Sequence, residues 1–253
     1  MECERMDCYE TVWNGFRRLN FRFENRVAVL IFPAQSRPGK PWLLKTEYFG
    51  AFPDLEIAML ERGFHVAFVK NTNRWGLRED VDCKKQFRDY LVREYGLAEK
   101  CIPVGMSCGG IFSVKLAAIY PQMVSAIYVD APVVNILSMM AMGQLSPDKM
   151  DEAEIIQALS LSRSELLSYR EHPLDYLPKL IENRIPACVV YGDADSLVPW
   201  EENVKLILDA YQGTDVPVSV FLKQGADHHP HALGGLSDMQ QAQMIDFLMK
   251  YSL

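Results

Sequence analysis

The stretch V-G-M-S-C-G-G, residues 104–110, places one serine between glycines where two hydrophobic patterns meet. A short apolar run over 101–104 precedes it, and an alanine-containing helical pattern follows over 112–120. In the pattern G-x-S-x-G, small neighbours let a strand and a helix approach closely, and the serine lies on a strained turn at the carboxyl edge of a sheet. The start of the following helix favours developing negative charge. We therefore interpret Ser107 as a candidate nucleophile; the alternative is a plain glycine turn.

The rest of the chain alternates between strand and helix patterns. This alternation predicts an α/β fold, with a mostly parallel central sheet and helices on both faces. The predicted strands cover residues 27–32, 42–48, 64–69, 101–104, 124–129, 185–191 and 218–222, and the predicted helices cover 53–62, 83–95, 112–120 and 239–251.

One segment, residues 133–183, breaks the alternation and contains no convincing strand. The pattern Ser162-Arg163-Ser164-Glu165 is typical of a capping box at a helix start. We predict that 133–183 is a small helical cap inserted between two parts of one core, residues 1–132 and 184–253.

Composition excludes several classes of protein. The 253 residues carry a formal net charge of −7 and no basic run, which argues against nucleic-acid binding. The six cysteines form no C-x-x-C pair. No apolar run is long enough to span a membrane, and the first residues lack the apolar stretch of a signal peptide. We expect a cytoplasmic protein, although a chain trimmed of its leader would look the same.

A serine nucleophile needs a base, and three of the five histidines lie in the segment G-A-D-H-H-P-H after the last predicted strand. His228 is the preferred candidate. His229 is the alternative, because a shift of one residue at a strand end reverses the direction of a side chain. We expect His231 to support the loop. The remaining two are interpreted as structural, His65 inside a strand and His172 at a surface helix end.

The base in turn needs a carboxylate that fixes its tautomer and stabilises its charged form. Asp195 follows the next-to-last predicted strand in the segment Y-G-D-A-D and is the preferred candidate, with Asp193 as a turn residue. Asp130 is a rival, because it also leaves a strand at the same edge of the sheet. The favoured role for Asp130 is to brace a loop.

The order Ser107, Asp195, His228 is the chain order described for α/β-hydrolases. With the segments G-M-S-C-G-G, G-D-A-D-S-L-V-P and G-A-D-H-H-P-H, the chain resembles α/β-hydrolase-fold serine hydrolases over most of its length, in particular a group of uncharacterised bacterial hydrolases. The resemblance implies these three residues as the triad and the N–H of Cys108 as one oxyanion donor. The usual His-Gly opening of the second oxyanion loop is absent, and we expect the N–H of Glu47 there.

The expected function is hydrolysis of a small carboxylic ester through an acyl-enzyme, with no cofactor or metal. Peptidase, thioesterase and acyltransferase activities use the same triad and stay open. The altered oxyanion loop also motivates a catalytically silent protein that binds a ligand or partner. A metal site among the histidines and aspartates near 193–231 is a further alternative.

Overall fold

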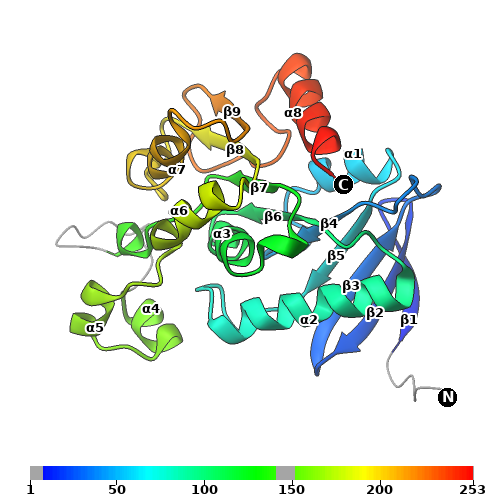
Figure 1. Ribbon diagram of the computed structural model, residues 1–253, viewed down its shortest axis with the longest axis horizontal. Helices are drawn as coiled ribbons and strands as arrows, with labels where there is room; N and C mark the ends of the chain where they lie inside the picture. Colours follow the sequence, from blue (N-terminus) through cyan, green and yellow to red (C-terminus); the bar gives the residue numbers. More distant parts are fainter. Residues whose placement is uncertain (1–7, 141–151, 253) are drawn as a thin grey trace.

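The computed structural model describes residues 8–140 and 152–252, and its centre is a nine-stranded sheet (Figure 1). The strands lie in the order β1-β2-β3-β5-β4-β6-β7-β8-β9. Their bounds are β1 (Tyr9–Trp13), β2 (Phe16–Phe23), β3 (Arg26–Phe32), β4 (Trp42–Lys45), β5 (His65–Val69), β6 (Ile102–Met106), β7 (Ile127–Asp130), β8 (Ala187–Gly192) and β9 (Val218–Lys223).

The direction of the strands divides the sheet into two parts. β1, β2, β3 and β5 pair antiparallel, whereas β5, β4, β6, β7, β8 and β9 pair parallel. Because parallel strands end at the same edge, the loops after β4, β6, β7, β8 and β9 converge there. The predicted mostly parallel sheet is confirmed.

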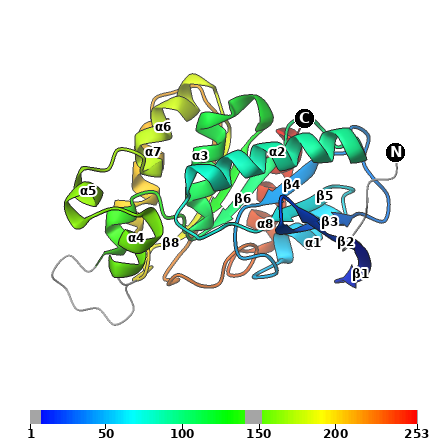
Figure 2. The same cartoon turned by 90° about the horizontal axis from the view of Figure 1, so that it is seen from below.

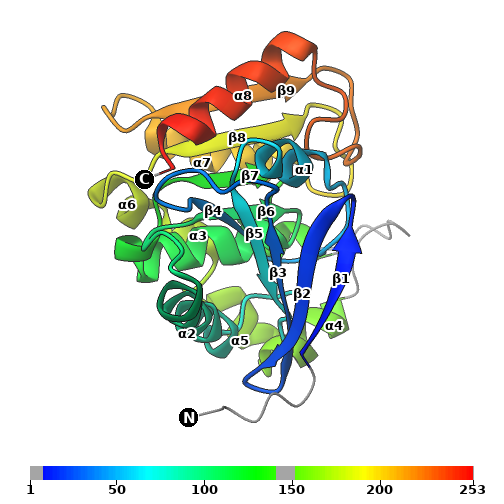
Figure 3. The same cartoon turned by 90° about the vertical axis from the view of Figure 1, so that its right-hand side faces the viewer.

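Helices cover both faces of this sheet (Figures 1 and 3). α1 and α8 pack on one face, and α2, α3, α6 and α7 pack on the other, each with its own apolar cluster. The bounds are α1 (Asp54–Leu60), α2 (Arg78–Tyr95), α3 (Gly109–Ile119), α4 (Glu152–Leu159), α5 (Arg163–Ser168), α6 (Pro173–Glu182), α7 (Val204–Tyr211) and α8 (Asp238–Lys250). Within residues 8–140 and 152–252, none of the helices is long and apolar enough to cross a bilayer.

The segment predicted as a cap is helical, and its described part contains no strand. α4 and α5 group together at the end of the molecule opposite the β1–β2 hairpin (Figure 2). Ile155 and Leu166 join a third apolar cluster with Trp75. α6 differs, because Leu177 and Leu180 pack into the main core beside α3. The division of the chain at 133 and 183 stays a prediction.

The structure also contains elements that the hydrophobic pattern did not predict. The β1–β2 hairpin lies at the edge of the sheet. Its strands contain several arginines and therefore no long apolar run that would have predicted them. Its turn, Asn14-Gly15, has left-handed φ at both residues (49° and 85°). Asn-Gly is the sequence signature of a tight hairpin, because both residues tolerate this conformation.

The hydrophobic pattern also missed α7. β4 ends at Lys45 rather than continuing to residue 48, and α2 begins at Arg78 rather than 83.

A buried ion pair joins the end of β4 to α1. Lys45 Nζ lies 2.6 Å from Glu56 Oε1, and both side chains are at most 4% exposed. Lys45 Nζ also donates to Met106 Sδ at 3.2 Å, at the end of β6. The pair therefore fixes the backbone directly below the loops that converge at the carboxyl edge.

We predict that Glu56→Ala lowers the free energy of unfolding by about 3–5 kcal/mol, because it leaves the Lys45 ammonium buried without its partner. Urea unfolding followed by circular dichroism measures the change. The double variant Lys45→Met/Glu56→Leu is expected to recover most of the loss. An Ala variant as stable as the parent would contradict the role given to the pair.

Candidate active site

Ser107 lies in the turn between β6 and α3, in a left-handed backbone conformation with φ of 51°. A non-glycine residue held in this way costs about 1–3 kcal/mol and persists only where its surroundings enforce it. Here Ser107 N donates to Asp130 O at 3.0 Å, and Ser107 O accepts from the N–H groups of Gly110 (2.9 Å) and Val133 (3.0 Å). The turn is therefore bonded to α3 and to the chain that leaves β7.

Two glycines allow the close packing around this turn. A Cβ on Gly105 would lie 2.5 Å from Gly109 O, and one on Gly110 would lie 2.4 Å from Pro132 Cβ. These distances are shorter than any van der Waals contact. A larger residue at 105 would push α3 away from β6, and one at 110 would push α3 away from the segment that follows β7. The predicted reason for the glycines, close approach of strand and helix, agrees with this geometry.

We predict that Gly105→Ala destabilises the protein by about 1–3 kcal/mol through overpacking. Gly109→Ala is the matched control, because its Cβ would meet Thr46 Oγ1 at a less severe 3.1 Å. Chemical denaturation of both variants checks the order. Equal stability of the two variants would show that the turn tolerates separation of β6 and α3.

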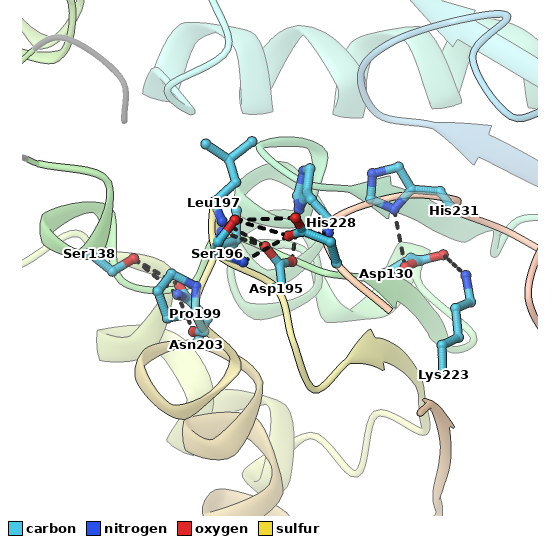
Figure 4. A network of polar contacts seen from close by, with 12 residues as sticks. Asp130, Ser138, Asp195, Ser196, Leu197, Pro199, Asn203, Lys223, His228 and His231 are labelled. Atoms are coloured by element: carbon cyan, nitrogen blue, oxygen red, sulfur yellow. Dashed lines mark hydrogen bonds and ion pairs between the residues drawn. The ribbon is translucent and has the colours of Figure 1, made fainter. Parts of the chain in front are cut away.

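Asp195 and His228 form a buried hydrogen-bonded pair at the carboxyl edge (Figure 4). His228 Nδ1 and Asp195 Oδ2 are 2.8 Å apart. Asp195 Oδ1 accepts from the N–H groups of Leu197 (3.0 Å) and Val198 (2.7 Å), which fixes the carboxylate. With a proton on Nδ1 donated to the carboxylate, Nε2 of neutral His228 is left as an acceptor.

Asp227, the residue just before His228, holds this loop in place. Asp227 Oδ1 accepts from the N–H groups of His228 and Ser196, both at 2.8 Å. The backbone hydrogen bonds from Ser196 and His228 lower the pKa of Asp227, so the carboxylate stays ionised. The loop after β9 is therefore bonded to the loop after β8, which carries Asp195.

Ser107 and His228 line one cavity of about 250 Å³. Within the part of the chain that the structure describes, no direct hydrogen bond joins the two side chains. Catalytic hydrogen bonds are often long in unliganded enzymes and shorten when substrate binds. The residues that line the cavity are Tyr48, Ala51, Phe52, Met106, Ser107, Leu197, His228, His229 and His231.

A larger hollow, of about 530 Å³, lies elsewhere. Its walls include Arg37 and Gly63, which precede β4 and β5, so it opens at the amino ends of the parallel strands. That is the edge of the sheet opposite Ser107. The smaller cavity is the candidate site, because it alone of the two is lined by Ser107 and by imidazoles.

Asp130, the rival carboxylate, binds His231 instead of His228. Asp130 Oδ1 lies 3.2 Å from His231 Nδ1, and Oδ2 accepts from Ala232 N (2.6 Å), Tyr128 Oη (3.1 Å) and Lys223 Nζ (3.4 Å). Burial raises the pKa of Asp130, but the hydrogen bond from His231 and the charge of Lys223 outweigh burial and hold the pKa below its usual value. Asp130 is thus an ionised brace under the loop that carries the histidines.

His229, the alternative base, has aromatic neighbours. Its ring stacks on Phe52, with centroids 5.1 Å apart, and lies edge-on to His231. Burial and the two neighbouring histidines lower the pKa of His229. The carboxylate hydrogen bonds at this edge go to His228 and His231, so geometry favours His228 over His229 as a base.

Cys108, Glu47 and Tyr48 lie near the turn at Ser107. Cys108 is the cap residue of α3, so its backbone belongs to the first turn, where N–H groups have no partner within the helix. Glu47 N lies 3.7 Å from the Cβ position of Gly109, and its carboxylate accepts from Asn71 Nδ2 at 2.6 Å. Tyr48 lines the cavity, and its phenol interacts with the Cys108 thiol and with Arg74.

Sequence reasoning missed Tyr48. Burial raises the pKa of its phenol, which therefore stays protonated as a hydrogen-bond donor. A signal was present, since a phenol three residues after a strand that ends at the carboxyl edge of the sheet is a candidate donor. The prediction of a strand through residue 48 concealed it.

The other two histidines have structural roles. His65 is buried in β5, where Ser36 Oγ and His65 Nε2 are 3.3 Å apart and burial lowers the pKa of His65 to about 4. His172 was predicted on the surface, but it is buried, and its Nδ1 accepts from Ile136 N at 3.3 Å. It is the N-cap residue of α6 and is buried because α6 packs on the core.

Among residues 8–140 and 152–252, no three His, Cys, Asp or Glu side chains are arranged to hold a metal ion.

Comparison with known proteins places this site in a family. The model of the prolyl oligopeptidase family matches residues 57–252, which is most of the chain and includes Ser107, Asp195 and His228. The chain belongs to the prolyl oligopeptidase family. The sequence-based expectation of a serine hydrolase with the α/β-hydrolase fold is confirmed at this level.

The curated relatives of this chain are much longer than the chain itself. The rat (Rattus norvegicus) acylamino-acid-releasing enzyme is 27% identical over 160 residues, or 60% of this chain, and the match covers 21% of that enzyme. The chain thus spans about a fifth of the curated relatives it matches.

Two solved structures show the shared fold. S-formylglutathione hydrolase from Agrobacterium tumefaciens has a TM-score of 0.66 at 14% identity, covering 98% of this chain and 99% of that one. A puromycin-hydrolyzing peptidase of Mycobacterium tuberculosis has a TM-score of 0.67 at 16% identity, covering 88% of this chain and 38% of that one.

Proposed function

We propose that this chain is a carboxylic ester hydrolase in which Ser107, His228 and Asp195 form the catalytic triad. The observation that carries the proposal is the 2.8 Å contact between Asp195 and His228, with His228 and Ser107 on one small cavity. The strained turn at Ser107 and the family of the chain support the same assignment.

In the proposed acylation step, Ser107 Oγ attacks the carbonyl carbon of the ester while His228 Nε2 takes the hydroxyl proton. Asp195 accepts from Nδ1–H and stabilises the imidazolium. The tetrahedral intermediate then collapses, the bond to the leaving oxygen breaks, and His228 gives its proton to the alcohol. Water attacks the acyl-enzyme with His228 again as base, which releases the acid and restores Ser107.

The developing oxyanion needs donors that are already in place. We assign one to the N–H of Cys108. For the second, Tyr48 Oη supplies a protonated donor on the cavity wall, and the N–H of Glu47 is the candidate from the sequence. Loss of one oxyanion donor costs about 2.7–4 kcal/mol of transition-state stabilisation, so the substitution Tyr48→Phe tests the phenol directly.

An ester is preferred to a peptide because of the size of the cavity. Sites for drug-sized ligands occupy roughly 300–1,000 Å³, whereas this cavity of about 250 Å³ suits a small acyl group. Cleavage of an aminoacyl amide is the second candidate, supported by the names of the rat relative and of the mycobacterial peptidase.

We predict that the protein hydrolyses short p-nitrophenyl esters faster than aminoacyl anilides, and that Ser107→Ala lowers kcat about a thousandfold or more. Ser125→Ala, at a partly buried serine outside the cavity, is the control for serine loss. Initial rates of ester and anilide hydrolysis, followed by absorbance, test the prediction for the parent protein and for both variants. Faster anilide cleavage would favour the peptidase; folded protein without either activity would favour the silent binding protein.

The choice between the two carboxylates gives a further prediction. Asp195→Asn is expected to lower kcat by about 10⁴-fold, because an amide favours the wrong tautomer of His228. Asp130→Asn is expected to lower kcat far less while reducing stability, since it removes the partner of Lys223. Steady-state kinetics on variants with native near-UV circular dichroism test this order, and the reverse order would make Asp130 the carboxylate of the triad.

A further inference from the structure

The cavity contains a second histidine–aspartate pair that the proposed triad does not use. His231 lines the same wall as His228, and their ring centroids are 4.8 Å apart, nearly perpendicular. Asp130 holds His231 through Nδ1 at 3.2 Å, just as Asp195 holds His228. Figure 4 shows both rings on one side of the two carboxylates. The pair is anchored to the nucleophile, because Asp130 O accepts from Ser107 N.

The hydrogen bond to Asp130 fixes the tautomer of His231. A carboxylate accepts, so Nδ1 of His231 carries the proton, and Nε2 of the neutral ring is a hydrogen-bond acceptor. The His231 side chain is 4% exposed and lines the cavity. Most other groups on this wall are apolar: Ala51, Phe52, Met106 and Leu197.

The carboxylates that hold the two histidines have different neighbours. Asp130 is paired with the ammonium of Lys223, so part of its charge is already neutralised. Asp195 accepts, besides His228, from the two backbone N–H groups of Leu197 and Val198. Asp130 therefore has an ammonium beside it, whereas the further donors to Asp195 are backbone N–H groups. Two positive charges on rings 4.8 Å apart would repel each other. In the proposed mechanism His228 carries the proton, which leaves Nε2 of His231 for contact with the substrate.

We propose that His231 is a substrate-binding residue whose Nε2 accepts a hydrogen bond from the acyl group, so that the enzyme selects esters with a hydroxyl or amino donor beside the carbonyl. This inference rests on the proposed function, because it assigns substrate class to the same cavity. A plain acyl chain leaves the acceptor of His231 without a partner against an apolar surface, and a hydroxyacyl group supplies one.

The test compares p-nitrophenyl lactate with p-nitrophenyl propionate, which differ by one hydroxyl group. After correction for their rates of alkaline hydrolysis, we expect wild-type protein to favour one lactate enantiomer by about tenfold in kcat/KM, the upper range for one neutral hydrogen bond. His231→Phe is expected to lower that ratio to about one. His231→Gln, whose amide oxygen reaches near the position of Nε2, should restore part of it.

His229→Phe is the matched control, because His229 lines the same cavity but stacks on Phe52. Its lactate preference is expected to remain. A wild-type ratio near one, or a ratio that is the same in wild type and His231→Phe, overturns the proposal. The wild-type ratio and the Gln variant decide the matter if the Phe variant does not fold.

Titration of Ser107 with a fluorophosphonate separates this proposal from the one on which it rests. Protein that reacts with the probe and hydrolyses both esters at the same corrected rate refutes only the role of His231. Folded protein that neither reacts with the probe nor hydrolyses either ester refutes the proposed function, and the role of His231 with it.

Discussion

The backbone conformation of Ser107 is the constraint on which the site depends. A serine with left-handed φ is maintained by hydrogen bonds to Asp130 and Val133 on one side and to Gly110 on the other. These contacts need α3 to lie against β6, which Gly105 permits. The same turn places the hydroxyl at the edge where the loops after the parallel strands meet, beside the N-terminal end of α3. The turn at Ser107 therefore both joins β6 to α3 and positions the serine hydroxyl.

Around that turn, a carboxylate lies at or just after the end of each of two neighbouring strands, β7 and β8, and one loop supplies a histidine to each carboxylate. Asp195 follows β8 and binds His228, and Asp130 ends β7 and binds His231. Lys223 neutralises part of the second pair only. We propose that the first pair transfers the proton and that the second pair contacts the substrate, both within a single cavity.

The sequence predicted the features that repeat along the chain and missed those set by tertiary contacts. Apolar runs located the parallel strands, and small residues marked the turn at Ser107. The β1–β2 hairpin lacked an apolar run, although Asn14-Gly15 signalled its turn. His172 was placed on the surface because its neighbours are polar, and only the packing of α6 explains its burial. Likewise, no local pattern tells which histidine Asp130 binds.

We propose that Ser107, His228 and Asp195 act as one catalytic unit. The most direct test is a crystal structure of the protein after reaction with a small alkyl phosphonate. The account predicts phosphorus bonded to Ser107 Oγ, His228 Nε2 within hydrogen-bond distance of that oxygen, and a phosphoryl oxygen facing the N–H of Cys108. A phosphonate on another residue, or His228 turned away from Ser107 with Asp195 still bound to it, would contradict the account.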